Sequence, residues 1–166
     1  MTPIVIVPFG DVDVLEDIKD AVARTFQQDV FFAHLQQEVN SERRGAQYLA
    51  HDFLPVIVSA TRAEGGDGGL GVTSVDLFVP ELNFVFGLAN YASRVCVISL
   101  ARLDHPDRDV FVLRSIKEAV HELGHALLGL KHCPDKRCVM AFSNSLADTD
   151  YKDPTFCPRC VKYLSH

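Results

Sequence analysis

Short apolar runs and a stretch of helical periodicity alternate along the first hundred residues. A short β-branched run at residues 4–7 lies between prolines and predicts a buried strand. From Asp11 to Phe26, apolar residues recur every three to four positions, which predicts an amphipathic helix. Further strand-like runs occupy residues 29–35, 70–79, 83–86 and 92–100. Strands that alternate with helices favour an α/β fold built on one sheet.

Two stretches between these elements have weaker patterns. Ser41 and Glu42 resemble a helix start, so we expect a second helix that runs toward Phe53 and is disturbed at Pro55. Residues 56–58 fit either a continuation of this helix or a strand. The glycine-rich residues 65–69 predict a flexible turn, since no Lys-Ser pair follows to make a phosphate-binding loop.

The clearest helical pattern covers residues 110–128, where apolar side chains form one broad stripe. Gly124 lies in the middle of this helix and costs ~1 kcal/mol relative to alanine. We therefore expect another chain segment or a substrate to approach the helix there. Gly129 predicts a left-handed helix end that turns the chain back toward His132.

Composition and charge restrict the class of protein. The chain has 166 residues, of which 48 % are hydrophobic and 23 % charged, as in a globular protein, and we expect one domain, residues 1–166. A net charge of −6 without a basic stripe argues against a nucleic-acid partner. The apolar runs are far shorter than the ~20 residues that span a bilayer, so no membrane segment is expected. The first residues lack a basic signal-peptide region, and we expect a cytoplasmic monomer.

Histidines at helical spacing point to a metal site. His121 and His125 lie four residues apart on one helix face and can reach one zinc ion, and His132 follows Gly129. Glu122 lies beside the metal and can take a proton from zinc-bound water as the water attacks a carbonyl. The protonated carboxyl can then pass that proton to the leaving amine. The remaining histidines are expected at the surface or in structural roles: His34, His51, His105 and His166.

Four of the five cysteines are clustered near the C-terminus. Two knuckle-like pairs fit a closed tetrahedral zinc site better than disulfides or a ferredoxin-type cluster: Cys133, Cys138, Cys157 and Cys160. We expect a structural zinc there, which makes two zinc ions per chain, whereas Cys96 is predicted to be a core thiol. Since His132 and Cys133 are neighbours, the structural zinc would fix the third histidine, although a finger that binds nucleic acid or a partner is the alternative. A change of composition near Gly129 predicts an N-terminal subdomain, residues 1–129, and a zinc-binding C-terminal subdomain, residues 130–166.

Together these residues resemble the archaemetzincins, a family within the metzincin clan of zinc peptidases. The resemblance rests on one ordered motif: His121-Glu122-x-x-His125-x-x-x-Gly129-x-x-His132-Cys133, then Cys138-x-Met140, then Cys157-x-x-Cys160. It implies that the three histidines bind the catalytic zinc, that Glu122 is the general base and that Met140 forms an apolar floor beneath the metal. It also implies a twisted, mainly parallel sheet of four or five strands with one antiparallel edge strand, for which residues 83–86 are our candidate. That edge could pair with an extended peptide substrate.

The sequence therefore predicts a zinc-dependent metallopeptidase that hydrolyses peptide bonds. One alternative is a zinc-stabilised binding or scaffold protein of the same fold with little turnover, against which the retained Glu122 argues. A zinc hydrolase of non-peptide amides would use an identical ligand set. Neither the physiological substrate nor the choice between endopeptidase and aminopeptidase follows from these residues.

Overall fold

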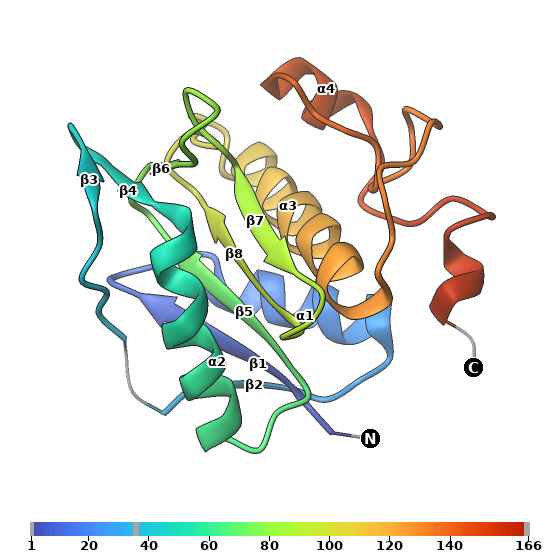
Figure 1. Ribbon diagram of the computed structural model, residues 1–166. Helices are drawn as coiled ribbons and strands as arrows, with labels where there is room; N and C mark the ends of the chain where they lie inside the picture. The colour runs from blue at the N-terminus through green and yellow to red at the C-terminus, as the bar shows by residue number, and fades with distance from the viewer. Residues whose placement is uncertain (1, 35–36, 165–166) are drawn as a thin grey trace.

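A five-stranded mixed sheet forms the centre of the computed structural model, which describes residues 2–34 and 37–164 (Figure 1). Its strand order is β2-β1-β5-β8-β7. The four parallel strands are β1 (Ile4–Phe9), β2 (Val30–Phe32), β5 (Gly68–Thr73) and β8 (Val95–Ser99). The edge strand β7 (Gly87–Asn90) pairs antiparallel with β8. The expected mixed sheet with one antiparallel edge is confirmed.

Helices cover both faces of this sheet. On one face lie α1 (Leu15–Phe26) and α3 (Arg108–Leu128), and on the other lies α2 (Phe53–Ala63) (Figure 1). Alternate residues of β1 enter different cores, with Ile4 and Ile6 in the α1/α3 core and Val5 and Val7 in the α2 core. Because both faces are buried, the strands read as continuous apolar runs. Strand β1 and helix α1 confirm two of the sequence predictions.

A second, three-stranded sheet replaces the helix expected from Ser41 to Phe53, and that prediction was wrong. Its strands are β3 (Arg43–Arg44), β4 (Gln47–Leu49) and β6 (Leu77–Phe78), in the order β3-β4-β6. Gly45, with φ +61°, makes the turn between β3 and β4. A 3₁₀ turn (Ala50–Asp52) precedes α2, which begins only at Phe53. Pro55 lies in the first turn of α2, where its missing N–H has no partner to lose.

Glycines at the start of β5 allow close packing. The predicted turn ends before Gly68, and both Gly68 and Gly69 belong to β5, so the expected flexible region was too long. A Cβ on Gly69 would lie 3.0 Å from Cγ2 of Ile57 in α2. The glycines therefore bring the helix against the strand, a reason that local sequence pattern does not reveal.

The antiparallel edge strand begins later than expected. Residues 83–86 form no strand of the main sheet, and within them Val85 makes only an isolated bridge with Leu77 of β6. The candidate edge at residues 83–86 was therefore wrong, and the edge is Gly87–Asn90. Residues 82–86 form the lip that leads into this edge.

The chain after α3 contains little regular structure. Within residues 130–164 there are one helix, α4 (Leu146–Tyr151), and one 3₁₀ turn (Val161–Leu164). Arg114 of α3 holds Asp150 of α4 through two hydrogen bonds of 2.8 Å, and this guanidinium lowers the pKa of Asp150. Cys138, Met140 and Cys157 pack into the same core as α3. Among the described residues, no helix has the length and apolar character needed to cross a membrane.

Candidate metal centres

The two ends of α3 explain how the third histidine reaches the first two. Asp107 caps the first turn by accepting a hydrogen bond of 2.9 Å from the backbone N–H of Asp109. Gly129 adopts φ +65° at the other end, where Leu130 donates its backbone N–H back to the carbonyl of Gly124 at 3.2 Å. This reversal directs the following residues, including His132, back along the helix.

Three imidazoles converge at this reversal. Nε2 of His125 lies 3.2 Å from Nε2 of His121, and candidate ligand atoms of all three histidines lie within 4.8 Å of one another. Nitrogen ligands at ~2.0–2.1 Å from a tetrahedral zinc are about 3.3 Å apart. The histidines therefore fit a single zinc ion without rearrangement of His121 and His125. His121 is buried and His132 is exposed, so the cluster opens toward solvent on one side.

Backbone carbonyls orient the first two rings. Nδ1 of His121 lies 2.8 Å from the carbonyl oxygen of Val139, and Nδ1 of His125 lies 2.5 Å from that of Leu130. A carbonyl can only accept, so each Nδ1 carries the proton and each Nε2 lone pair is free. Burial lowers the pKa of all three histidines, which favours the neutral ring that binds a metal.

Glu122 lies beside this cluster with its carboxyl against the edge strand. Its side chain is buried, and a Cβ on Gly87 of β7 would lie 2.7 Å from Oε2 of Glu122. Only glycine at position 87 leaves room for the carboxyl at this edge. Burial, followed by the nearby Glu118, raises the pKa of Glu122 to about 8. Glu122 is therefore a carboxyl that can hold a proton near neutral pH.

Met140 packs underneath α3 at Gly124. Met140 is fully buried, and a Cβ on Gly124 would collide with its sulfur and lie 3.4 Å from the ring of Phe156. The segment that approaches Gly124 is thus the turn of residues 138–141, called the Met140 turn below. Of the two expectations from the sequence, a chain segment or a substrate, it is the chain segment. The neighbouring Val139 carbonyl is the partner of His121, so this packing also affects the metal cluster.

We expect Gly124→Ala to lower the free energy of unfolding by about 1–2 kcal/mol. Overpacking costs about 1–3 kcal/mol, and it outweighs the ~1 kcal/mol that alanine gains over glycine inside a helix. Urea denaturation measures the change. In a Met140→Ala background the collision is absent, and there the same substitution should be neutral or stabilising. An equal cost in both backgrounds would show that Met140 is not the reason for the glycine.

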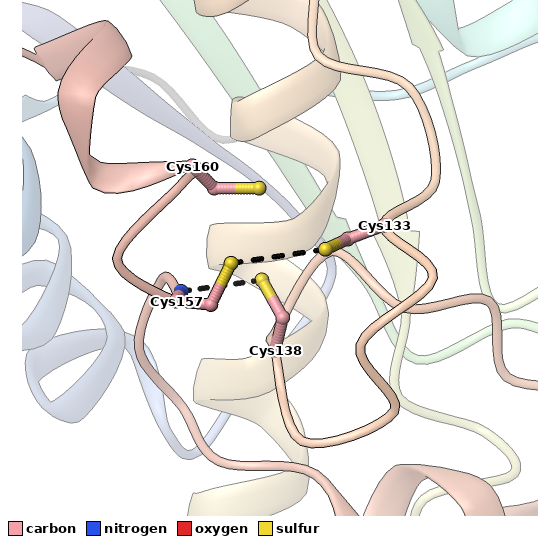
Figure 2. Close-up of side chains that lie close together, drawn as sticks. All are labelled: Cys133, Cys138, Cys157 and Cys160. Atoms are coloured by element: carbon pink, nitrogen blue, oxygen red, sulfur yellow. Dashed lines mark hydrogen bonds between the residues drawn. The ribbon is translucent and has the colours of Figure 1, made fainter.

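Four thiols form a second cluster (Figure 2). Their sulfur atoms lie within 4.8 Å of one another and none is in a disulfide: Cys133, Cys138, Cys157 and Cys160. The sulfurs of Cys133 and Cys157 are 3.7 Å apart. Thiolates at ~2.3 Å from a tetrahedral zinc are about 3.8 Å apart, so this separation fits a shared ion.

Backbone amides surround these sulfurs. Sγ of Cys138 accepts hydrogen bonds from the N–H groups of Met140 and Cys157, at 3.4 Å and 3.3 Å. Although burial raises the pKa of Cys157, the backbone amides of Cys160 and Arg159 lower it to about 7. The amide donors favour the thiolates of Cys138 and Cys157, the form that binds zinc, whereas burial raises the pKa of Cys138 and Cys160.

One backbone hydrogen bond holds the segment between the two clusters. The N–H of Cys133 donates to the carbonyl of Met140 at 3.0 Å, and His132 immediately precedes Cys133. The cysteine cluster thus holds the segment that carries the third histidine against the Met140 turn. This arrangement agrees with the bracing role expected from the two neighbouring residues.

A cleft of about 650 Å³ runs over the histidine cluster. One wall is the edge strand with its lip, and the other contains Phe142 and Ser143. Side chains of the small sheet hold the lip: Nη2 of Arg44 donates to the carbonyls of Leu82 and Asn83 at 2.7 Å and 2.9 Å. The three-stranded sheet therefore shapes the cleft, a role that the sequence did not indicate.

Two charged residues in this cleft escaped the sequence analysis. Glu118 lies one helical turn before Glu122 on α3, and this spacing is visible in the sequence. Nothing in the sequence connects Lys152 with α3. Of the other histidines, His34, His51 and His105 are exposed, and His166 lies outside the described residues. Cys96 is fully buried, as expected.

Comparison with known proteins gives consistent matches over almost the whole chain. The model of Peptidase family M54 matches residues 58–166. An archaemetzincin of Pyrococcus abyssi is 39 % identical over 181 residues, covering 99 % of this chain and 95 % of that protein. The crystal structure of an archaemetzincin of Methanopyrus kandleri matches with a TM-score of 0.79 and 38 % identity, covering 98 % of this chain and 93 % of that one. An archaemetzincin of Archaeoglobus fulgidus, solved in complex with malonate, matches with a TM-score of 0.81 and 33 % identity, covering 97 % and 99 %.

Proposed function

This chain belongs to Peptidase family M54, the archaemetzincins, which makes it a zinc metallopeptidase, and we propose that Glu122 is its general base. We further propose that His121, His125 and His132 bind the catalytic zinc. The observation that carries this assignment is the 3.2 Å separation of two Nε2 atoms, with the buried Glu122 beside them. Zinc bound there would act as a Lewis acid on a peptide carbonyl and make water a stronger nucleophile near neutral pH.

Glu122 performs the proton transfers in this proposal. Its carboxylate accepts the proton of the attacking water and then donates it to the nitrogen of the leaving amine. Burial favours the protonated carboxyl, and a divalent cation at the histidines would favour the carboxylate. With the ion bound, the two effects on the pKa of Glu122 would oppose each other, and a group that transfers protons needs both its protonated and its ionised form.

The substrate is a peptide that we place along the edge strand. β7 is paired on one side only within the described sheet, so an extended peptide can add to it as a further strand. Such pairing would bring a scissile carbonyl over His121 and Glu122, which line the same cleft as Leu88 and Ala89 of β7. Main-chain hydrogen bonds would align the peptide whatever its sequence.

We propose a second, structural zinc at Cys133, Cys138, Cys157 and Cys160, and a single catalytic domain with two subdomains. Residues 1–129 carry the sheet and the motif helix, and residues 130–166 carry the cysteines. The shared core of Leu123, Met140 and Cys138 supports one domain, since it crosses the boundary between these parts. The hydrogen bond from Cys133 to Met140 supports the bracing role of the second zinc.

Metal analysis of the purified protein tests both sites. We expect two zinc ions per chain in the wild type and one in His121→Ala. The hydrogen bond from Nδ1 to Val139 orients the ring of His121 so that its Nε2 can bind the catalytic zinc, and alanine removes this ligand. His105→Ala is the matched control, since His105 is exposed and outside both clusters, and it should keep both ions. Retention of two ions in His121→Ala would contradict the ligand assignment.

A further inference from the structure

Glu118 is a buried carboxyl without a hydrogen bond. It lies on α3 one turn before Glu122, is 3 % exposed and lines the cleft. Within the described part of the chain no group donates a hydrogen bond to it or forms an ion pair with it. Lys152 attracts this carboxyl electrostatically but makes no hydrogen bond with it within the described residues, and buried carboxyls without a hydrogen bond are uncommon in folded proteins. A ligand in the cleft would supply the missing donor.

Lys152 provides a buried cation in the same cleft. It is 2 % exposed, and its Nζ donates to the carbonyl of Ala141 at 2.9 Å. Nζ also lies 3.5 Å from Nδ1 of His121, but this nitrogen donates to Val139 and cannot accept. An ammonium has three donors, so two of them have no acceptor among these neighbours. Lys152 can therefore donate to a bound molecule.

Ser143 adds a third polar group. Its Oγ is buried and makes no hydrogen bond with any residue that the structure describes, although it lines the cleft. Ser143 belongs to the wall that follows Met140, Lys152 comes from the chain after α4, and Glu118 comes from α3. Three elements thus bring an acceptor, a donor and a hydroxyl to the lining of one cleft.

We propose that Glu118, Lys152 and Ser143 form a subsite that binds the carboxamide side chain of a glutamine or asparagine in the peptide substrate. The inference rests on the proposed peptidase function and adds a specificity to it. The amide NH₂ donates to Glu118, and the amide oxygen accepts from Lys152 and Ser143. One neutral group thereby satisfies both buried charges.

Other side chains satisfy this subsite less well. A carboxylate meets Lys152 but is repelled by the carboxylate of Glu118. An ammonium or guanidinium meets Glu118 but is repelled by Lys152. An apolar side chain makes no hydrogen bond with Glu118 or Lys152, and sites built for hydrogen bonds reject such analogues strongly.

Peptide binding to the zinc-loaded Glu122→Gln variant tests the subsite without turnover. Fluorescence anisotropy is measured with labelled peptides that are identical except for one central residue, which is Gln, Glu, Lys or Met. These four side chains have similar lengths and differ in charge and hydrogen bonding. We expect the Gln peptide to bind at least about tenfold more tightly than the other three. Equal dissociation constants for the four peptides would overturn the proposal.

A second variant reverses the preference. Adding Glu118→Gln replaces the acceptor carboxylate by an amide next to Lys152, so the Glu peptide should gain at least about tenfold relative to the Gln peptide. Glu16→Gln, at an exposed position of α1, is the matched control and should leave the order unchanged. An unaltered order in the Glu118→Gln variant would overturn the subsite.

The same peptides distinguish the two proposals. Cleavage by the wild type, followed by mass spectrometry, reports on the peptidase function. If the wild type cleaves none of them while the Gln peptide still binds preferentially, the catalytic proposal fails and the subsite stands. If all four are cleaved and bound equally, the peptidase function stands and the subsite fails.

Discussion

Glu122→Gln is expected to reduce the rate of peptide cleavage by roughly 10²- to 10⁴-fold, the contribution of a general acid–base group. Glutamine has the same shape and fits beside Gly87, but its amide can neither accept the proton of the attacking water nor deliver it to the leaving amine. The zinc content should stay at two ions per chain, since Glu122 is not among the clustered ligands. kcat/KM on a peptide that the wild type cleaves is the quantity to measure.

The control for this substitution is Glu16→Gln, which changes an exposed carboxyl far from the cleft in the same way. Its kcat/KM should equal that of the wild type. Cleavage that is unaffected by Glu122→Gln would remove Glu122 from the mechanism. If the wild type with two bound zinc ions cleaves no peptide in a broad library, the scaffold alternative gains support instead.

Cys157→Ser is expected to release one zinc ion and to destabilise the chain after α3. Structural zinc contributes about 10–16 kcal/mol to the folding of small zinc-finger peptides. Here Cys138 and Met140 also pack into the apolar core, which does not depend on zinc. We therefore expect the free energy of unfolding to fall by less than in those peptides, but by at least about 3 kcal/mol. For a domain of this size that loss lowers Tm by about 10 °C. Differential scanning calorimetry and metal analysis on the same samples measure both effects.

The same substitution should also reduce peptidase activity, because Cys133 ties His132 to the Met140 turn. Cys96→Ala is the matched control: it removes a buried thiol outside the cluster and should keep both zinc ions, at the cost of a small cavity. Loss of one zinc ion without any change in melting would contradict the structural role of the cysteine cluster.

Local sequence pattern predicted the strand that is buried on both faces and the helix that buries one broad apolar stripe. β1 is a continuous apolar run and α3 repeats apolar residues about every 3.6 positions, and both were placed within a few residues of their observed ends. The candidate metal ligands could also be predicted from the sequence, since i,i+4 histidines share a helix face and short cysteine spacings are typical of zinc sites. Within each cysteine pair and within the histidine motif the residues are close in sequence, whereas the two cysteine pairs, with Cys133 and Cys157 24 positions apart, were grouped by residue type alone.

The errors fall where tertiary contacts outweigh local preference. Residues 41–53 have a helix-like start, yet Arg44 and Gln47 form a hairpin because their side chains bind carbonyls of the distant cleft lip. Gly68 and Gly69 resemble a flexible turn, but the approach of neighbouring helices requires them inside a strand. No window of sequence contains the partners that decide these structures.

The sequence by itself determined the family, the helix that carries His121 and His125, and the two groups of candidate metal ligands, because all of these depend on residue type and short spacing. Only the tertiary structure decided which other residues lie close to the candidate metal ligands and Glu122. Glu118 and Lys152 are 34 positions apart, and Gly87 reaches Glu122 only because β7 borders the sheet beside α3. The surroundings of a site are set by packing between distant segments, and for this chain that packing defines the cleft in which a substrate would be selected.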